Sequence, residues 1–276
     1  MSAAVAAVCG TATATEPCDD FGECKVLVEI NSTDGDIGFH FLGDADDLRS
    51  MRLDDPNGAK IFEYGVSSAG RDQLWTESFG ESAEPLCWPN PDEDPEDWED
   101  IVTLREFYER WEAGTYVFTG KGEGGEMLYG ETELSFNLPA APQNVNFNGA
   151  SITWTDGDDL GNCAPMSDPA EGVETIYDLD DIVDVVDADV FEIVMEPDVE
   201  DGDATGALVY SIRVPAGTYA VEVPALYLAA LPENTPVKIE VGAISADDNA
   251  TFTEVDGFCV NPYVVLGEDE ECGEED

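Results

Sequence analysis

The sequence contains a single histidine, His40, and no recognisable catalytic motif. A Ser-His-Asp or Cys-His site would have to use this one imidazole. The patterns of P-loops, dinucleotide-binding turns, nucleophile elbows and zinc proteases are all missing, and so is any C-x-x-C pair. Alternation places His40 on the opposite side of a strand from Phe39 and Phe41. We therefore expect it to face solvent without a catalytic or metal-binding role.

Long apolar runs and basic residues are scarce as well. No stretch of 18 or more apolar residues occurs, so we expect no membrane span. Only 10 Lys and Arg stand against 63 Asp and Glu, which gives a formal net charge of −53 at pH 7. A surface of this charge repels nucleic acid and anionic lipid, and we expect neither as a partner.

The acidic residues accompany apolar residues instead of replacing them. Apolar residues make up 43% of the chain, which is enough for a core, so we expect most carboxylates on the surface. The surface expected for this mass gives one acid per ~180 Å². Repulsion between exposed charges reaches about 8 Å at physiological salt and about 30 Å at 0.01 M salt. The acids therefore repel one another mainly in dilute buffer. We expect stability to increase with salt or divalent cations, as in a halophilic protein.

The two ends and the cysteines indicate an exported protein. Residues 1–15 are small and apolar and resemble part of a secretory signal, although a basic n-region is missing and a frayed Ala-rich end is the alternative. Without Cys9, six of the seven cysteines remain, an even number that suits disulfides. Cys18 and Cys24 are the pair close enough in sequence to predict. The acidic tail, residues 267–276, is expected to be loose.

Period-two alternation predicts an all-β fold. The strands expected in the first half are Lys25–Ile30, Ile37–Leu42, Leu48–Leu53, Ile61–Val66, Leu74–Phe79, Thr115–Gly120 and Met127–Leu138. Ala69-Gly70 is expected to be a turn. A capping box, Thr103 to Glu106, predicts one short helix that ends before Gly114. Residues 85–100 contain four prolines and are expected to form a loop.

The second half follows a proline-containing boundary at residues 138–142. Its expected strands are Asn144–Phe147, Ser151–Thr155, Val190–Glu196, Ala207–Val214, Tyr219–Val223, Val237–Ile244 and Thr251–Val255. A long acidic insert, residues 156–189, separates the second and third of them. Within it, apolar residues at helical spacing from Ile176 to Val186 predict a short amphipathic helix.

Several segments of this half resemble a fibronectin type III domain: residues 142–145 (PQNV), 151–154 (SITW), 216–219 (AGTY) and 237–241 (VKIEV). Trp154 matches the family's core Trp on the second strand, and Leu231 matches the Leu before its sixth strand. Val237 replaces the usual core Tyr, and the connection between the second and third strands is longer than in the family. The resemblance implies a seven-stranded sandwich over about 120 residues. Such modules serve as spacers or binding surfaces and need no catalytic residues.

Three acidic loops are candidate calcium sites, since calcium prefers six to eight oxygen ligands. The candidate ligands are Asp92, Asp94, Asp97, Asp156, Asp158, Asp201 and Asp203. Residues 201–206 (DGDATG) begin like a calcium loop, but Ile212 stands where the bidentate Glu is needed. Each loop also has an ordinary interpretation as a turn or a solvated segment. Diffuse binding of divalent cations by the whole surface is the alternative to specific sites.

These observations predict two tandem β-sandwich-type domains with one or two short helices. The expected division is a signal-like or disordered segment (1–15), a β-rich domain (16–139), a fibronectin III-like domain (140–266) and an acidic tail (267–276).

We expect a non-enzymatic binding or structural protein that is secreted or at the cell surface. Its expected partners are divalent cations and, beyond them, a protein, a polysaccharide or another copy of the chain. One alternative is a carboxylate-based polysaccharide hydrolase with its cleft near Trp88 and Trp98. Another is a self-assembling surface-layer or fibre subunit.

Overall fold

The computed structural model describes residues 18–88, 101–163, 183–199, 202–267 and 272–273. The all-β prediction is confirmed. The strands of the first half are β1 (Glu23–Asn31), β2 (Asp36–Leu48), β3 (Ser50–Asp54), β4 (Lys60–Gly65), β5 (Trp75–Glu81), β6 (Gly114–Lys121), β7 (Met127–Leu134) and β8 (Asn137–Pro139). Those of the second half are β9 (Gln143–Phe147), β10 (Ser151–Thr155), β11 (Asp184–Val186), β12 (Val190–Pro197), β13 (Tyr210–Pro215), β14 (Ala220–Glu222), β15 (Thr235–Ile244), β16 (Ala250–Val260) and β17 (Val264–Val265). Within the described ranges, three short α-helices accompany them: α1 (Ala69–Gln73), α2 (Leu104–Arg110) and α3 (Ala225–Leu228).

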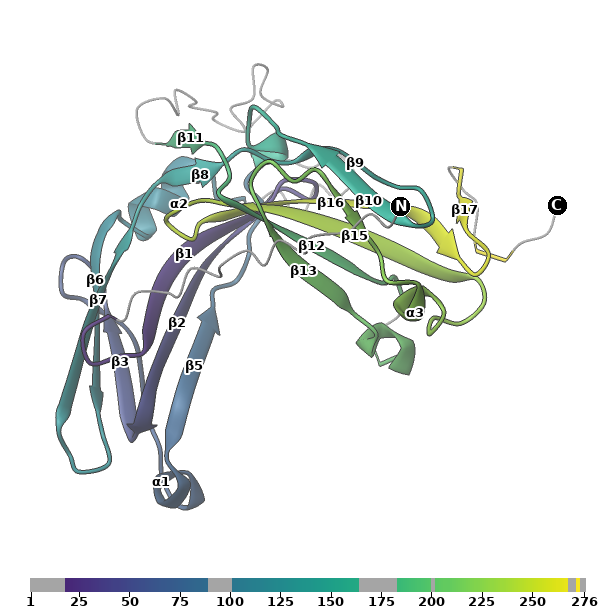
Figure 1. Ribbon diagram of the computed structural model, residues 1–276. Coiled ribbons are helices and arrows are strands. Elements are labelled where there is room, and N and C mark those ends of the chain that lie inside the picture. The colour runs from purple at the N-terminus through teal and green to yellow at the C-terminus, as the bar shows by residue number, and fades with distance from the viewer. Residues whose placement is uncertain (1–17, 89–100, 164–182, 200–201, 268–271, 274–276) are drawn as a thin grey trace, which may run out of the picture.

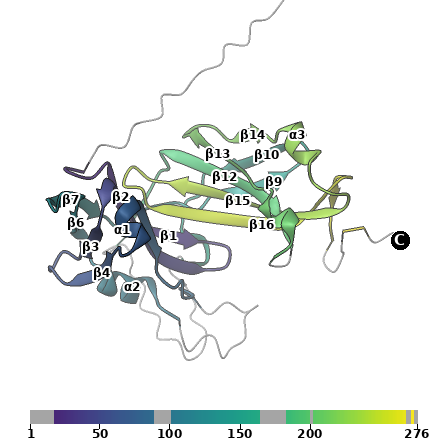
Figure 2. The same ribbon diagram turned by 90° about the horizontal axis from the view of Figure 1, so that it is seen from below.

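One long sheet runs through both halves of the chain. Its strand order is β13-β12-β15-β16-β1-β2-β5, and β17 pairs with β16. The halves meet where β1 and β16 pair in parallel, with residues 29–31 opposite residues 250–252. Figures 1 and 2 show these two strands side by side, and Figure 1 shows the long sheet bending into an arch. The predicted boundary at residues 138–142 is therefore bridged by backbone hydrogen bonds between distant parts of the sequence.

A smaller sheet completes each sandwich. In the first half, the sheet β4-β3-β6-β7 shares a core with β1 and β2, formed by Val28, Phe39, Met51, Phe118 and other apolar side chains. The helix α2 adds Leu104, Phe107 and Tyr108 to this core. Its capping box is present as predicted, with Thr103 and Glu106 bonding each other's backbone.

The second sandwich is fibronectin type III-like. A three-stranded sheet, β14-β10-β9, faces the four strands β13-β12-β15-β16. This arrangement of seven strands is the one that the resemblance predicted. The matched residues Trp154, Leu231 and Val237 are 3%, 4% and 1% exposed and belong to one core.

Both cores lie on the same side of the long sheet. Residues paired across a ladder share a face. Phe39 pairs with Val28, and both belong to the first core. Two positions along β1, Ile30 pairs with Thr251, which in turn pairs with Ala243 of the second core. The opposite face is left uncovered by the smaller sheets and forms the inner side of the arch (Figure 1).

The six described cysteines form three disulfides: Cys18–Cys24, Cys87–Cys163 and Cys259–Cys272. The first confirms the predicted pair, while Cys9 lies outside the described residues. The second disulfide joins the two halves. The third ties residue 272 to β16, so the prediction of a loose tail is wrong at this point.

Other differences concern local structure. Ala69–Gln73 forms α1 where a turn was expected, and a break at Ser135-Phe136 divides the strand predicted over 127–138 into β7 and β8. The predicted helix over 176–186 lies largely outside the described residues. Its last part is the strand β11 instead, because residues 184–186 gain backbone partners by pairing in parallel with β8.

Candidate functional site

Three ionisable side chains converge on the inner face of the long sheet. Glu29 comes from β1, His40 from β2 and Glu84 from the segment that follows β5. Because side chains alternate along a strand, Glu29 and His40 point away from the core that Val28 and Phe39 enter. Each of the three side chains offers one ligand atom, and these three atoms all lie within 4.8 Å of one another. Among the described residues, this is the one group of three or more His, Cys, Asp or Glu side chains whose ligand atoms come this close together.

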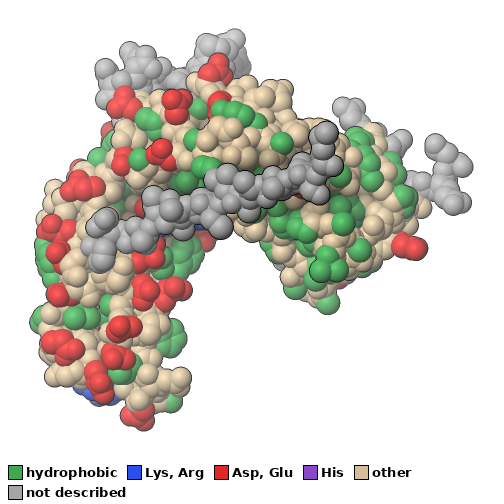
Figure 3. Space-filling view, in the orientation of Figure 1, with side chains coloured by type: hydrophobic (Ala, Val, Ile, Leu, Met, Phe, Trp, Pro, Cys, Tyr) green, Lys and Arg blue, Asp and Glu red, His purple; other side chains and the backbone are tan. Residues whose placement is uncertain are grey.

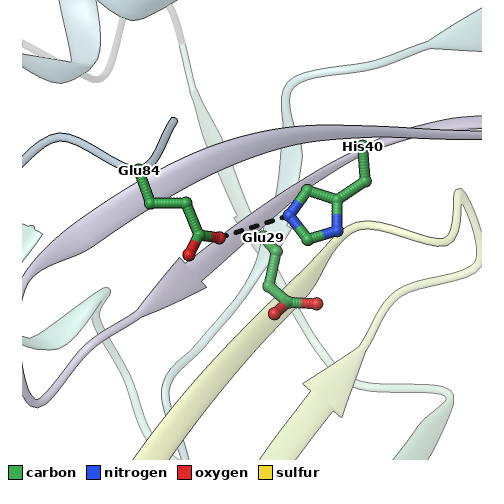
Figure 4. Close-up of side chains that lie close together, drawn as sticks. All are labelled: Glu29, His40 and Glu84. Carbon is green, nitrogen blue, oxygen red and sulfur yellow. Dashed lines mark hydrogen bonds and ion pairs between the residues drawn. The ribbon is translucent and has the colours of Figure 1, made fainter. Parts of the chain in front are cut away.

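The histidine is held by contacts on two sides. Its Nε2 lies 3.3 Å from Oε1 of Glu84 (Figure 4), and its ring meets Phe79 edge to face at 5.7 Å between centroids. These neighbours leave His40 only 7% exposed. The prediction that it faces away from Phe39 and Phe41 is confirmed, but the prediction that it faces solvent is wrong, because Glu84 and Phe79 cover it.

Gly38 provides the room for this convergence. It pairs with Glu29 across β1 and β2 and lies on the same face as His40. A Cβ at this position would come 2.6 Å from Oε1 of Glu84 and 2.8 Å from Nε2 of His40. Both distances are too short for unbonded atoms, so the two side chains occupy the space that a larger residue would need.

The local field is strongly negative. Burial raises the pKa of Glu29, and the nearby carboxylates of Glu84 and Glu81 raise it further against the opposing effect of His40. Burial disfavours the imidazolium of His40, but the hydrogen bond to Glu84 and the charges of Glu29 and Glu81 outweigh it and raise its pKa. Burial also raises the pKa of Asp36 to about 7, with contributions from Glu84 and Asp34.

The acidic character continues across the junction onto the second sandwich. Lys238 of β15 has its Nζ 3.1–3.3 Å from carboxylates of Glu196, Glu240 and Glu254. One lysine thus forms ion pairs with three carboxylates. Glu240 is also close enough to raise the pKa of Glu29. The inner face therefore carries one acidic surface that extends over both halves.

On the molecular surface, acidic side chains are spread over the limb formed by the first sandwich (Figure 3). Apolar side chains gather at the far end of the second sandwich, near α3. Leu226 of α3 is 83% exposed.

The predicted calcium ligands do not form a common site in the described part of the chain. Asp92, Asp94, Asp97 and Asp201 lie outside it. Asp156 accepts a 2.5 Å hydrogen bond from the Tyr219 hydroxyl, and Asp158 accepts one of 3.0 Å from the Gln143 amide. Asp203 caps the short turn Ala204–Ala207 by accepting from the Thr205 N–H at 2.8 Å. These contacts fit the turn interpretation, and calcium binding at these loops stays a prediction.

The cleft expected near the tryptophans has little acid-base chemistry among its described residues. Trp98 lies outside them, and the indole of Trp88 donates to the Asp34 carbonyl at 3.2 Å. A pocket close by in sequence is lined by Pro85, Val102, Glu106, Arg110 and Trp111. The one carboxylate among the described lining residues, Glu106, caps α2. A hydrolase of the expected kind needs two carboxylates in such a pocket.

Sequence reasoning missed the convergence of Glu29, His40 and Glu84. Alternation correctly assigned His40 to the face opposite the core, but it could not show which side chains of other segments reach that face. A glycine two positions before the only histidine was the one local signal. It indicates room beside the imidazole, although it does not identify the neighbours.

No helix among the described residues has the length and apolar character needed to cross a membrane. No protein-family model matches the sequence, and no curated protein matches it.

The solved structures that match this chain include fibronectin type III and adhesin segments. A two-domain fibronectin type III segment of chicken tenascin is 10% identical, with a TM-score of 0.24, and the match covers 87% of this chain and 98% of that one. A tetra-tandem repeat from the extending region of a large adhesion protein is 12% identical, with a TM-score of 0.21, over 85% of this chain and 49% of that one. A structure of a 1.5-MDa bacterial ice-binding adhesin is 10% identical, with a TM-score of 0.20, and the match covers 87% of this chain and 64% of that one. The fibronectin III-like description of the second sandwich rests on its own strand order and not on these matches.

Proposed function

We propose that this protein is an exported, non-enzymatic binding or structural module whose acidic surface is neutralised by salt or divalent cations. The observation that carries the proposal is the long sheet shared by two sandwiches, whose acidic inner face is left open by the smaller sheets among the described residues. A continuous sheet gives a stiff support, and the exposed face offers a surface to a partner. The described residues of this face contain far more carboxylates than cations.

The disulfides support the extracellular part of the proposal. Six described cysteines are paired in three bridges. Such bridges form and persist in oxidising compartments and are rare in the cytosol. A secreted or cell-surface location fits this chemistry.

Thermal melting in chelator at low and high NaCl tests the dependence on cations. Repulsion among carboxylates acts over about 30 Å at 0.01 M salt and about 3 Å at 1 M, so the melting temperature should rise by several degrees between these conditions. Equal melting temperatures would contradict the proposal.

Calcium calorimetry then separates two modes of binding. Saturation at micromolar calcium supports sites in the acidic loops, whereas a salt-sensitive millimolar response supports diffuse neutralisation.

The two alternatives have distinct outcomes. Light scattering that increases with calcium concentration would favour a self-assembling surface-layer or fibre subunit. Release of reducing ends from a panel of polysaccharides would overturn the non-enzymatic proposal and favour the hydrolase. Co-sedimentation with the same polysaccharides without release would identify a carbohydrate as the partner.

A further inference from the structure

We propose that Glu29, His40 and Glu84 form a binding site for a single divalent transition-metal ion, best matched by zinc. The site is separate from the acidic loops predicted to bind calcium. It lies on the inner face of the arch, where three different segments of the first sandwich each supply one ligand (Figure 4).

The geometry is close to that of a bound ion. Zinc takes nitrogen and oxygen ligands at about 2.0–2.2 Å in a tetrahedral arrangement, which places the ligand atoms roughly 3.5 Å apart. The present ligand atoms are within 4.8 Å of one another, and the His40–Glu84 pair is already at 3.3 Å. Small rotations of the two Glu side chains close the remaining gap. Three protein ligands would leave a fourth position for water or for a group from a partner.

The donor set favours a transition metal over calcium. Imidazole is a good ligand for zinc and its neighbours in the first transition row, whereas calcium and magnesium prefer oxygen ligands alone. Calcium also needs six to eight oxygens. Two carboxylates balance the charge of a divalent ion, and the neutral imidazole completes the set.

The surroundings independently favour a cation at this place. The two lysines on this face are engaged elsewhere: Lys25 contacts Glu23 and Asp248, and Lys238 contacts its three glutamates. Gly38 keeps the space beside the ligand atoms of His40 and Glu84 free of a Cβ. Burial of the His40 ring against Phe79 holds the imidazole in place before an ion arrives.

The competing explanation is a His40–Glu84 ion pair that needs no metal. Calorimetric titration of the full chain with zinc chloride separates the two. About 1 M NaCl and an excess of calcium suppress diffuse binding by the other carboxylates. We expect one zinc per chain with saturation at micromolar concentration. His40→Gln, Glu29→Gln and Glu84→Gln should each weaken binding at least about tenfold, because loss of a ligand costs no less than loss of an outer-shell partner.

Glu123→Gln is the matched control. Glu123 is exposed in the turn between β6 and β7, so its change removes one charge without touching the site. Its zinc affinity should equal that of the unaltered chain. If Glu84→Gln binds zinc as tightly as Glu123→Gln does, the proposal is wrong. Glu84 is itself exposed, so this variant should fold even if the Glu29 or His40 variants do not.

Nuclear magnetic resonance gives a second readout. Because His40 is the only histidine, its ring signals are unambiguous. One equivalent of zinc should shift them, and one equivalent of cobalt should shift them paramagnetically. Zinc binding that leaves these signals unmoved would overturn the proposal, as would the absence of saturable zinc binding. Neither result would bear on the proposed structural role of the protein.

Discussion

Asn249 connects the two sandwiches through its side chain. Its Oδ1 accepts from the Val28 N–H at 2.9 Å, and its Nδ2 donates to the carbonyls of Ser135 and Asn137 at 3.1 and 3.0 Å. The residue is 0% exposed. One amide thus satisfies backbone groups of β1, of β8 and of Ser135, two residues before β8, all distant in sequence from its own turn.

Asn249→Ala should destabilise the protein by about 3 kcal/mol, because it leaves several buried backbone groups without partners. Urea unfolding measures the effect. Asn148→Ala is the control, since Asn148 caps an exposed turn and its loss should cost less than about 1 kcal/mol. Equal losses of unfolding free energy in the two variants would show that the Asn249 side chain does not stabilise the contact between the two sandwiches.

Asp36 should make stability depend on pH. Burial raises the pKa of its carboxyl to about 7 from the ordinary 3.8. Between these pH values the folded form holds a proton that the unfolded chain releases, so the contribution of Asp36 to stability falls as pH rises. The free energy of unfolding of Asp36→Asn should therefore equal that of the unaltered protein near pH 4 and exceed it at pH 8. The full shift is equivalent to about 4 kcal/mol, which solvent screening reduces to about 1–2 kcal/mol.

Urea unfolding in chelator at pH 4, 6 and 8 measures this difference. Asp72→Asn, at an exposed position of α1, is the charge-matched control and should show no growing advantage. A constant difference between Asp36→Asn and the unaltered protein across this range would contradict the assignment.

At the scale of single elements, α2 shows how local sequence and packing combine. Seven residues are too few for a stable isolated helix. Its capping box satisfies N–H groups at the start, while Leu104, Phe107 and Tyr108 enter the first core. The cap determines where the helix begins, and the core stabilises it.

Thr103→Ala should cost about 1 kcal/mol of folding free energy, since it removes the hydroxyl that accepts from the Glu106 N–H. Thr103→Ser keeps a hydroxyl and should restore most of the loss. Hydrogen exchange at Phe107 and Trp111, which donate to the Thr103 and Phe107 carbonyls, reports on the helix directly. Equal exchange in the Ala and Ser variants would argue against the cap.

At the scale of the whole molecule, the two sandwiches are joined in several independent ways. The parallel pairing of β1 and β16, the Asn249 contacts and the Cys87–Cys163 disulfide all cross the predicted boundary. Ser32 adds a 3.0 Å hydrogen bond to Thr253. We therefore expect the sandwiches to unfold in a single transition, whose calorimetric and van't Hoff enthalpies should agree. Two separate transitions would contradict this.

The disulfides should differ in their contributions. Cys87–Cys163 closes a segment of 76 residues and Cys259–Cys272 one of 13. In the chain-entropy description, the longer loop is worth about 4 kcal/mol and the shorter about 3 kcal/mol. Replacing Cys87 and Cys163 by Ala should lower stability more than replacing Cys259 and Cys272, as measured by urea unfolding. The reverse order would show that native-state contacts outweigh the chain entropy.

Much of the local structure was predictable from particular residues. Alternation located β1, β4, β12 and β15 to within two residues, although it ended the strand at Leu42 where β2 continues to Leu48. Thr103 and Glu106 marked the start of α2, and the spacing of Cys18 and Cys24 indicated their disulfide. Trp154 identified the second core. The fibronectin III-like order of strands then followed from resemblance and was confirmed.

The sequence by itself determined the all-β class, the core-facing residues of most strands and an acidic exterior, because periodicity, caps and charge act over a few neighbouring residues. Only the tertiary structure decided that β1 pairs with β16, that Asn249 reaches Val28 across 221 positions, and that Glu29, His40 and Glu84 meet. The physical reason is that alternation assigns a side chain to a face, whereas its neighbours on that face depend on which strands pair and in which register.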